Sequence, residues 1–269
     1  MKKNIFVSVL VFGVFLLVSG DIFAHTLWLN VSDYAPKFSS EYGAATKIYF
    51  GYGHDYPVDD FLPLDELKEF YSVDSEGSRE NLKPNQGGFL ATQAAFKLQG
   101  IYRIGAVKEA GFYTMYMEKG KIHHKLGPKT GLKNIVKSFH YEQYAKSLVN
   151  IGNIKSDSFS KPIGHKLEIV PLNNPADLKG NGGDFLSVKV LFKGKPAKFC
   201  KVYATYSGFS SGEDFAFSTA TNGAGIAKIR LIHWGPWLIK AKLQLSPKDD
   251  LKDKCNKLNY TATLTFEVP

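Results

Sequence analysis

The sequence predicts an all-β fold of two β-sandwich domains, the C-terminal one immunoglobulin-like or prealbumin-like. Apolar and polar residues alternate strictly along residues 258–268, which is typical of a half-buried strand. Further alternating segments are separated by short turns, such as residues 221–225, whose asparagine and glycines suit positive φ. Several short strands separated by turns of this kind indicate an antiparallel sandwich.

The chain opens with the pattern of a secretory signal peptide. Lys2 and Lys3 precede a largely apolar stretch over residues 5–18, and Ile-Phe-Ala stands before a cut after Ala24. The apolar stretch is too short for a comfortable membrane span. We therefore expect residues 1–24 to be removed and the mature protein to be exported to the periplasm as a soluble chain.

The N-terminal half is less regular than the rest. Residues 130–149 are ambiguous, because their apolar residues first follow a helical spacing that then breaks. A short helical turn is expected at residues 65–70, and strands are expected at residues 25–31, 47–52 and 112–117. The serine-rich stretch from 153 to 164 is the expected seam between domains. This gives an N-terminal β-rich domain over residues 25–160 and a C-terminal β-sandwich over residues 161–269.

The C-terminal domain contains both cysteines of the chain, Cys200 and Cys255. Two thiols in one domain of an exported protein usually pair, so we expect a structural disulfide between them. Neither sulfur is then available as a metal ligand. The alternating segments predict strands at residues 186–192, 200–206, 239–245 and 258–268.

Charge and motifs exclude several functions. The net charge of +9 is spread along the chain, and no RNA-binding signature or recognition-helix pattern accompanies it, so nucleic acid is not an expected partner. The spacings of zinc proteases, zinc fingers, serine hydrolases and phosphate loops are absent. Neighbouring carboxylates, such as Glu213 with Asp214, are typical of solvated loops rather than of a glycosidase pair. The sequence therefore favours a protein that is not an enzyme.

Signal cleavage would make His25 the first residue of the mature chain. Its α-amine, with a pKa of about 7.7–8, and its ring, with a pKa of about 6.5, can both lose a proton near neutrality. Together they can close one chelate ring on a metal ion. The alternative is that the cut merely falls in front of a histidine.

A second candidate ligand, His54, follows a predicted strand in the segment Gly53-His54-Asp55-Tyr56-Pro57. A strand-end loop that faces the start of the first strand could bring His54 to His25. Asp55 could bind the metal as well, or accept a hydrogen bond from the second imidazole nitrogen. The alternative is a hydrophilic turn without a ligand.

The remaining histidines favour other roles. His123 and His124 are expected on an exposed hairpin, and His233 as a buried or turn histidine. His165 would be a ligand only if the two domains pack together at the seam. His140 lies near two tyrosines and is a weak candidate for a pocket.

Five segments together resemble a bacterial family of periplasmic proteins of unknown function, described as the periplasmic component of cobalt/nickel ABC uptake systems. They are residues 24–29 (AHTLWL), 53–57 (GHDYP), 167–175 (LEIVPLNNP), 191–196 (LFKGKP) and 225–239. The resemblance implies binding of Ni²⁺ or Co²⁺ outside the cytoplasmic membrane and delivery to a membrane uptake transporter. Only His25 and His54 occupy its motif positions; a histidine that members often carry near the C-terminus is absent from residues 241–244.

Imidazole and amine nitrogens suit Ni²⁺ and Co²⁺ but also Cu²⁺ and Zn²⁺, so the residue types do not select the metal. The leading hypothesis is a divalent transition-metal binding protein that uses His25, His54 and Asp55. The main alternative is an exported carbohydrate-binding or adhesive β-sandwich without a metal function. A copper oxidase with an N-terminal histidine is a third and weaker reading.

Overall fold

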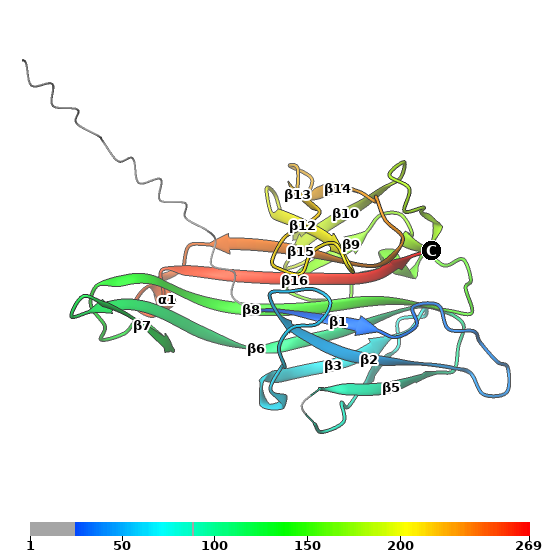
Figure 1. Cartoon of the computed structure of the whole chain (residues 1–269), viewed down its shortest axis with the longest axis horizontal. Helices are drawn as coiled ribbons and strands as arrows, with labels where there is room; N and C mark the ends of the chain where they lie inside the picture. Colours follow the sequence, from blue (N-terminus) through cyan, green and yellow to red (C-terminus); the bar gives the residue numbers. More distant parts are fainter. Residues whose placement is uncertain (1–24, 88) are drawn as a thin grey trace, which may run out of the picture.

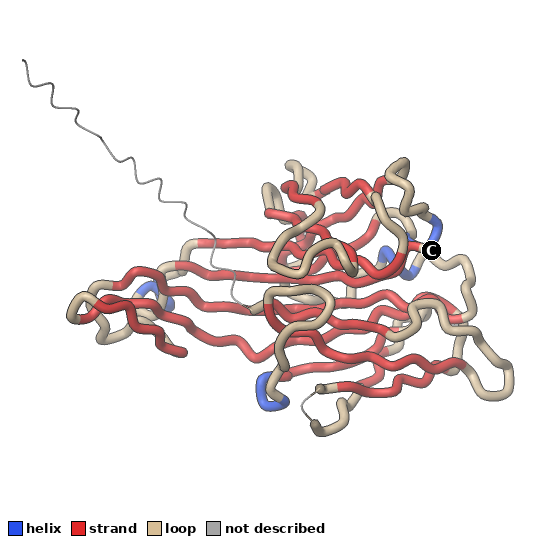
Figure 2. The backbone as a smooth tube through the Cα atoms, in the orientation of Figure 1, coloured by secondary structure: helices blue, strands red, loops and turns tan. Residues whose placement is uncertain are grey.

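The computed structural model describes residues 25–87 and 89–269, so the predicted signal peptide, residues 1–24, lies outside the described chain. Within the described residues almost all regular structure is β-strand, arranged in three sheets (Figure 2). The described helical segments are α1 (Asp249–Lys252) and the 3-10 turns η1 (Leu64–Glu66), η2 (Ser158–Ser160) and η3 (Pro175–Asp177). None of the described helices has the length and apolarity that a membrane crossing requires. The predicted all-β fold class is confirmed.

A nine-stranded sheet forms the centre of the described molecule (Figure 1). In spatial order its strands are β13 (Phe217–Ala220), β12 (Lys201–Tyr206), β15 (Gly235–Leu245), β16 (Lys257–Val268), β8 (Ile135–Ile151), β6 (Gly100–Glu118), β3 (Leu67–Val73) and β4 (Arg79–Asn81), and β7 (Lys121–Leu126) also pairs with β6. The last strand, β16, lies in the middle, antiparallel to β15 and parallel to β8. The sheet contains strands from both sides of the predicted domain boundary at residue 160, which itself stays a prediction.

Two smaller sheets cover opposite faces of the central sheet (Figure 1). One consists of β1 (Thr26–Val31), β2 (Ala44–Gly53) and β5 (Ala91–Phe96); the other consists of β9 (Leu167–Pro171), β10 (Phe185–Phe192), β11 (Lys195–Pro196) and β14 (Ile226–Arg230). Tyr144 and Leu148 of β8 point into the core under the second sheet, whereas Ala145 and Val149 point into the core under the first. The fold is therefore two β-sandwiches that share one sheet.

The alternation predicted for residues 258–268 is present in β16, whose apolar residues lie in the C-terminal core. The opposite face is also buried towards the end of the strand, where β1 covers Thr263 and Thr265. Their hydroxyls donate hydrogen bonds to the carbonyls of Leu27, at 2.8 Å, and Leu29, at 2.7 Å. The prediction of a half-buried strand is wrong there. No described strand pairs with this edge of β1, and the two threonines supply hydrogen-bond donors to its carbonyl groups instead.

The ambiguous segment over residues 130–149 is largely a strand, since β8 begins at Ile135. Val136, which fits the helical apolar spacing, is 52% exposed. Strand β8 pairs with β6 along one edge and with β16 along the other, so long-range pairing overrides the local pattern. The helical turn expected at residues 65–70 is confirmed only at its start, because β3 begins at Leu67.

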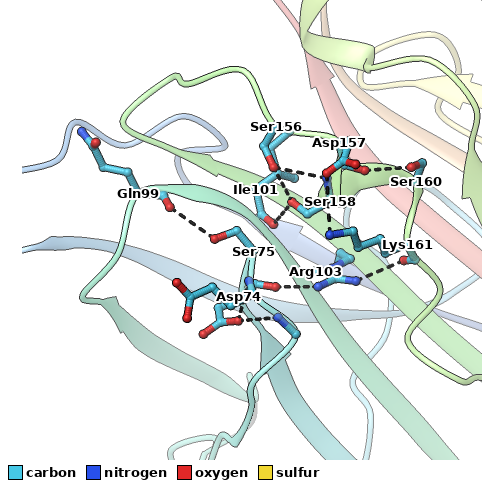
Figure 3. Close-up of polar contacts among 12 residues, drawn as sticks. Asp74, Ser75, Gln99, Ile101, Arg103, Ser156, Asp157, Ser158, Ser160 and Lys161 are labelled. Carbon is cyan, nitrogen blue, oxygen red and sulfur yellow. Dashed lines mark hydrogen bonds and ion pairs between the residues drawn. The ribbon is translucent and has the colours of Figure 1, made fainter.

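A buried arginine fastens the expected domain seam, residues 153–164, to the central sheet (Figure 3). Arg103 of β6 is 2% exposed and donates hydrogen bonds to the carbonyls of Asp74, at 2.5 Å, and Lys161, at 3.3 Å. Ser158 is fully buried and donates to another β6 carbonyl at 2.8 Å. The seam is thus packed against the sheet at both of these points.

A buried ion pair lies at the end of this seam. Lys146 Nζ is 2.7 Å from Glu168 Oε1, and both side chains are almost fully buried. Burial opposes ionisation of Glu168, but Lys146 and the backbone N–H of Ile163 outweigh it and lower the pKa of the carboxyl. His165 packs beside the pair, and burial lowers its pKa to about 4. Its imidazole is therefore neutral in the folded protein at neutral pH.

The expected disulfide is absent from the structure, in which Cys200 and Cys255 are both free and buried. The two sulfurs point at different backbone carbonyls: Cys200 Sγ lies 3.3 Å from Lys242 O, and Cys255 Sγ lies 3.6 Å from Leu251 O. Burial raises the pKa of the Cys200 thiol to about 12. Both cysteines act as small apolar residues of the C-terminal core.

Candidate metal centre

Strand β1 places His25 at the margin of the N-terminal sandwich. One edge of β1 pairs with β2, which sets Thr26 opposite Gly53. On the other edge the side-chain amide of Gln143, which is 5% exposed, forms a clamp. Gln143 Nε2 donates to His25 O at 2.8 Å, and Leu27 N donates to Gln143 Oε1 at 2.8 Å. These two hydrogen bonds resemble those between paired strands, and they hold the backbone of His25 in place.

The loop that carries His54 is held from inside by Asp59. Gly53 precedes His54 with φ +140, and a Cβ added there would come within 2.2 Å of Asp59 Oδ2, so only glycine fits. The same oxygen accepts hydrogen bonds from the backbone N–H groups of His54, at 2.6 Å, and Asp55, at 3.2 Å. The hydrogen bond from His54 N–H lowers the pKa of Asp59 and keeps it ionised.

A tryptophan of β1 anchors the far end of this loop. Trp28 lies opposite Gly51 in the β1–β2 pairing, and the absence of a side chain at Gly51 makes room for the indole. Trp28 Nε1 donates to Pro57 O at 2.9 Å, and Asn30 Nδ2 donates to the same carbonyl at 2.9 Å. The Tyr56–Pro57 peptide bond is cis. Strand β1 therefore positions both histidines, one directly and one through the loop.

The two histidines meet as the sequence predicts. The ring centroids of His25 and His54 are 4.8 Å apart, with the ring planes at 70° to each other. Tyr52 flanks them, with its ring 5.1 Å from the ring of His25. At this separation, one nitrogen of each ring can coordinate the same cation after small side-chain rotations.

A carboxylate from the C-terminal sandwich joins the pair. Glu213, in the loop between β12 and β13, places Oε1 3.0 Å from His54 Nδ1. The distance between these two atoms is within the range of an ion pair, but the angles at the contact do not meet the criteria for a hydrogen bond. The sequence pattern assigned Glu213 to a solvated loop. No local signal could reveal its role, because residues 54 and 213 approach only through the packing of the two sandwiches.

Asp55 does not complete a cluster with the two histidines. Among residues 25–87 and 89–269, no three His, Cys, Asp or Glu side chains are grouped so that they could hold a metal ion. Asp55 Oδ1 is buried without a hydrogen-bond partner, and it is Asp59 that organises the loop. The α-amine that cleavage after Ala24 would create lies on His25 itself.

The other histidines lie in different surroundings. His123 and His124 are on β7, where they contact Tyr116 and Tyr113. The ring of His140 packs against Phe112, and that of His165 is buried beside Tyr144. The ring of His233 stacks on Tyr206 with centroids 4.3 Å apart. These placements confirm the hairpin expectation for His123 and His124.

Comparison with known families gives one match that spans most of the chain. The model of a domain of unknown function, DUF4198, matches residues 22–244. Its description names no activity, metal or transporter, so the cobalt/nickel role stays a prediction. No curated protein matches the chain.

Similar solved structures include bacterial adhesins, at low similarity. The D0-D1 domain of Intimin is 14% identical, covers 88% of this chain and 96% of its own, and has a TM-score of 0.21. The Yersinia pseudotuberculosis adhesin InvE is 14% identical over 89% of this chain and 58% of its own, with a TM-score of 0.22. At these values neither similarity supports the transfer of a function.

Proposed function

We propose that this chain, which belongs to the DUF4198 family of domains of unknown function, binds a divalent transition-metal ion between His25 and His54. The observation that carries the proposal is the 4.8 Å separation of the two imidazole rings. They lie 29 positions apart in the sequence: His25 directly precedes β1, and His54 lies in a loop that β1 fastens. Imidazole nitrogen is the commonest protein ligand for such ions.

The donor set is completed by the mature terminus. After cleavage in front of His25, its α-amine and its ring belong to the same residue and chelate one ion. Two imidazoles and an amine are neutral nitrogen donors that suit Ni²⁺, Co²⁺, Cu²⁺ and Zn²⁺. The Gln143 clamp on the His25 carbonyl holds this residue in place, which reduces the entropy lost on binding.

The position of Glu213 supports Nε2 as the nitrogen through which His54 binds the metal ion. Its carboxylate lies at Nδ1, which favours a proton on that nitrogen and leaves Nε2 as the ligand atom. The carboxylates of Glu213 and Asp59 also make the local potential more negative, which favours a cation.

The resemblance to periplasmic components of cobalt/nickel uptake systems supports Ni²⁺ or Co²⁺ as the ion. It also supports the periplasm as the compartment and a membrane uptake transporter as the recipient. In this role the metal is cargo and no reaction is catalysed. The ordinary affinity order would still place Cu²⁺ above Ni²⁺ and Co²⁺, so availability decides which ion is carried.

The test is calorimetry with Ni²⁺, Co²⁺, Cu²⁺ and Zn²⁺ on protein that begins at His25. We expect one site, and an affinity loss of about tenfold or more both for His54→Ala and for protein that retains Ala24. His123→Ala is the matched control, since it removes a histidine of the distant β7 and should leave binding unchanged. Unchanged affinity in both site variants would refute the proposal and favour the carbohydrate-binding or adhesive alternative.

A further inference from the structure

One end of the central sheet extends beyond both smaller sheets as an arm (left in Figure 1). The arm comprises residues 112–137, which are the outer part of β6, the whole of β7 and the start of β8. Lys119 and Gly120 join β6 to β7 with φ of +50 and +74, as in the tight hairpin turn that matches the twist of paired strands. Among the described strands β7 pairs only with β6, so its outer edge has no described strand beside it.

The arm carries an apolar face that is open to solvent. Met117 of β6 lies opposite Ile122 of β7, and Tyr113 of β6 lies opposite Leu126 of β7. Directly opposed residues of an antiparallel pair share a face, and so do residues four positions apart on one strand. Met117, Ile122 and Leu126 are 44%, 55% and 85% exposed. Three large apolar side chains are therefore exposed together near the end of the arm, which favours a surface that binds a partner.

The arm is also strongly basic. Residues 112–137 contain six lysines and one acidic residue, Glu118. Four of these lysines are exposed and have no ion pair with a described carboxylate: Lys119, Lys121, Lys125 and Lys133. The neighbouring segment, residues 248–257, contains four lysines and three aspartates, so it does not neutralise the charge of the arm. A partner of this surface is therefore expected to be negatively charged.

An anionic phospholipid bilayer fits this combination better than another protein does. A standard protein–protein interface uses about 20–30 residues on each side, far more than the end of a hairpin offers. A bilayer surface can instead be bound through a few apolar side chains together with lysines that face the lipid phosphates. We propose that the end of the arm binds an anionic phospholipid membrane, with Ile122 and Leu126 at the depth of the headgroups and the four exposed lysines against the phosphates. The arm contains neither His25 nor His54, so this inference does not rest on the proposed metal function.

The experiment is co-sedimentation of metal-free protein that begins at His25 with two kinds of vesicle: phosphatidylcholine alone, and phosphatidylcholine with about 30% phosphatidylglycerol. We expect binding to the anionic vesicles to be about tenfold tighter or more. The variant Lys119→Gln/Lys121→Gln/Lys125→Gln/Lys133→Gln should weaken this binding by about 100-fold or more, because each lysine near an anionic surface contributes a factor of about five. Ile122→Ser/Leu126→Ser should weaken it by about tenfold or more, because less apolar surface leaves water.

Matched controls make the same changes away from the arm. Lys179→Gln/Lys195→Gln/Lys198→Gln/Lys228→Gln removes four exposed lysines on and beside the sheet of β9, β10, β11 and β14, and Phe185→Ser/Ile232→Ser removes two half-exposed apolar side chains there. Both controls should bind anionic vesicles as the unchanged protein does, and circular dichroism checks that every variant is folded. Four results would each overturn the inference: no binding to anionic vesicles, equal binding to both kinds of vesicle, undiminished binding by either arm variant, or an equal loss in its control.

Discussion

Replacing Gln143 by leucine tests whether its amide clamp positions His25. Leucine has a similar volume, but it removes the hydrogen bonds of Gln143 with His25 O and with Leu27 N–H. The N–H of Leu27, which is 1% exposed, is then left without an acceptor. Each lost hydrogen bond costs about 1 kcal/mol, and a buried unsatisfied donor costs about 1–3 kcal/mol. The free energy of unfolding should therefore fall by about 2–4 kcal/mol.

The assay is urea unfolding of Gln143→Leu, followed by calorimetry with Ni²⁺ under conditions where the variant is folded. Metal affinity should also fall, because the carbonyl of His25 loses its anchor. Gln244→Leu is the matched control: this amide bonds to Asn259 at the exposed surface, so its loss should change stability by less than about 0.5 kcal/mol. The reasoning fails if Gln143→Leu costs no more than this control and binds metal as tightly as wild type.

Three further predictions concern the packing around the site and the core. Gly51→Ala places a Cβ 2.0 Å from a buried indole nitrogen and should destabilise the fold by about 2 kcal/mol or more in urea unfolding, whereas Gly223→Ala, with open space around it, should be neutral. Folding keeps His165 neutral, with a pKa of about 4 against 6.5 when unfolded, so its contribution is complete above pH 6.5 and is lost as the pH falls towards 4. That loss amounts to about 3 kcal/mol, and a stability curve for His165→Leu that is as steep as wild type in this window would contradict it. Alkylation in urea without reductant should label both Cys200 and Cys255; an unlabelled pair would show a disulfide.

The C-terminal strands were predictable because their side chains alternate between a core and a polar face. The pattern of β16 shows directly which residues enter the C-terminal core. It cannot show that Thr263 and Thr265 are buried, because threonine is as common on a solvent-exposed face of a sheet as it is against an unpaired strand edge. The partner that covers them, β1, lies more than 230 residues earlier in the chain.

The approach of His25 and His54 was predictable because a strand and the loop after its neighbour are local features. The remaining site residues were not. Gln143 acts from a segment whose apolar spacing also suits a helix, and Glu213 comes from a loop that reads as solvated. Both contacts depend on how the shared sheet brings distant segments together, which no spacing within the chain encodes.

The central position of β16 has a consequence for how this polypeptide acquires its structure. Its twelve residues lie between β15 and β8, so the sheet stays divided into two halves until the C-terminus has been synthesised. Until β16 is in place, β12 and β15 cannot be aligned with β8 and with the Gln143 clamp that it carries. The strand that completes the C-terminal core is therefore also the strand that joins it to the N-terminal sandwich.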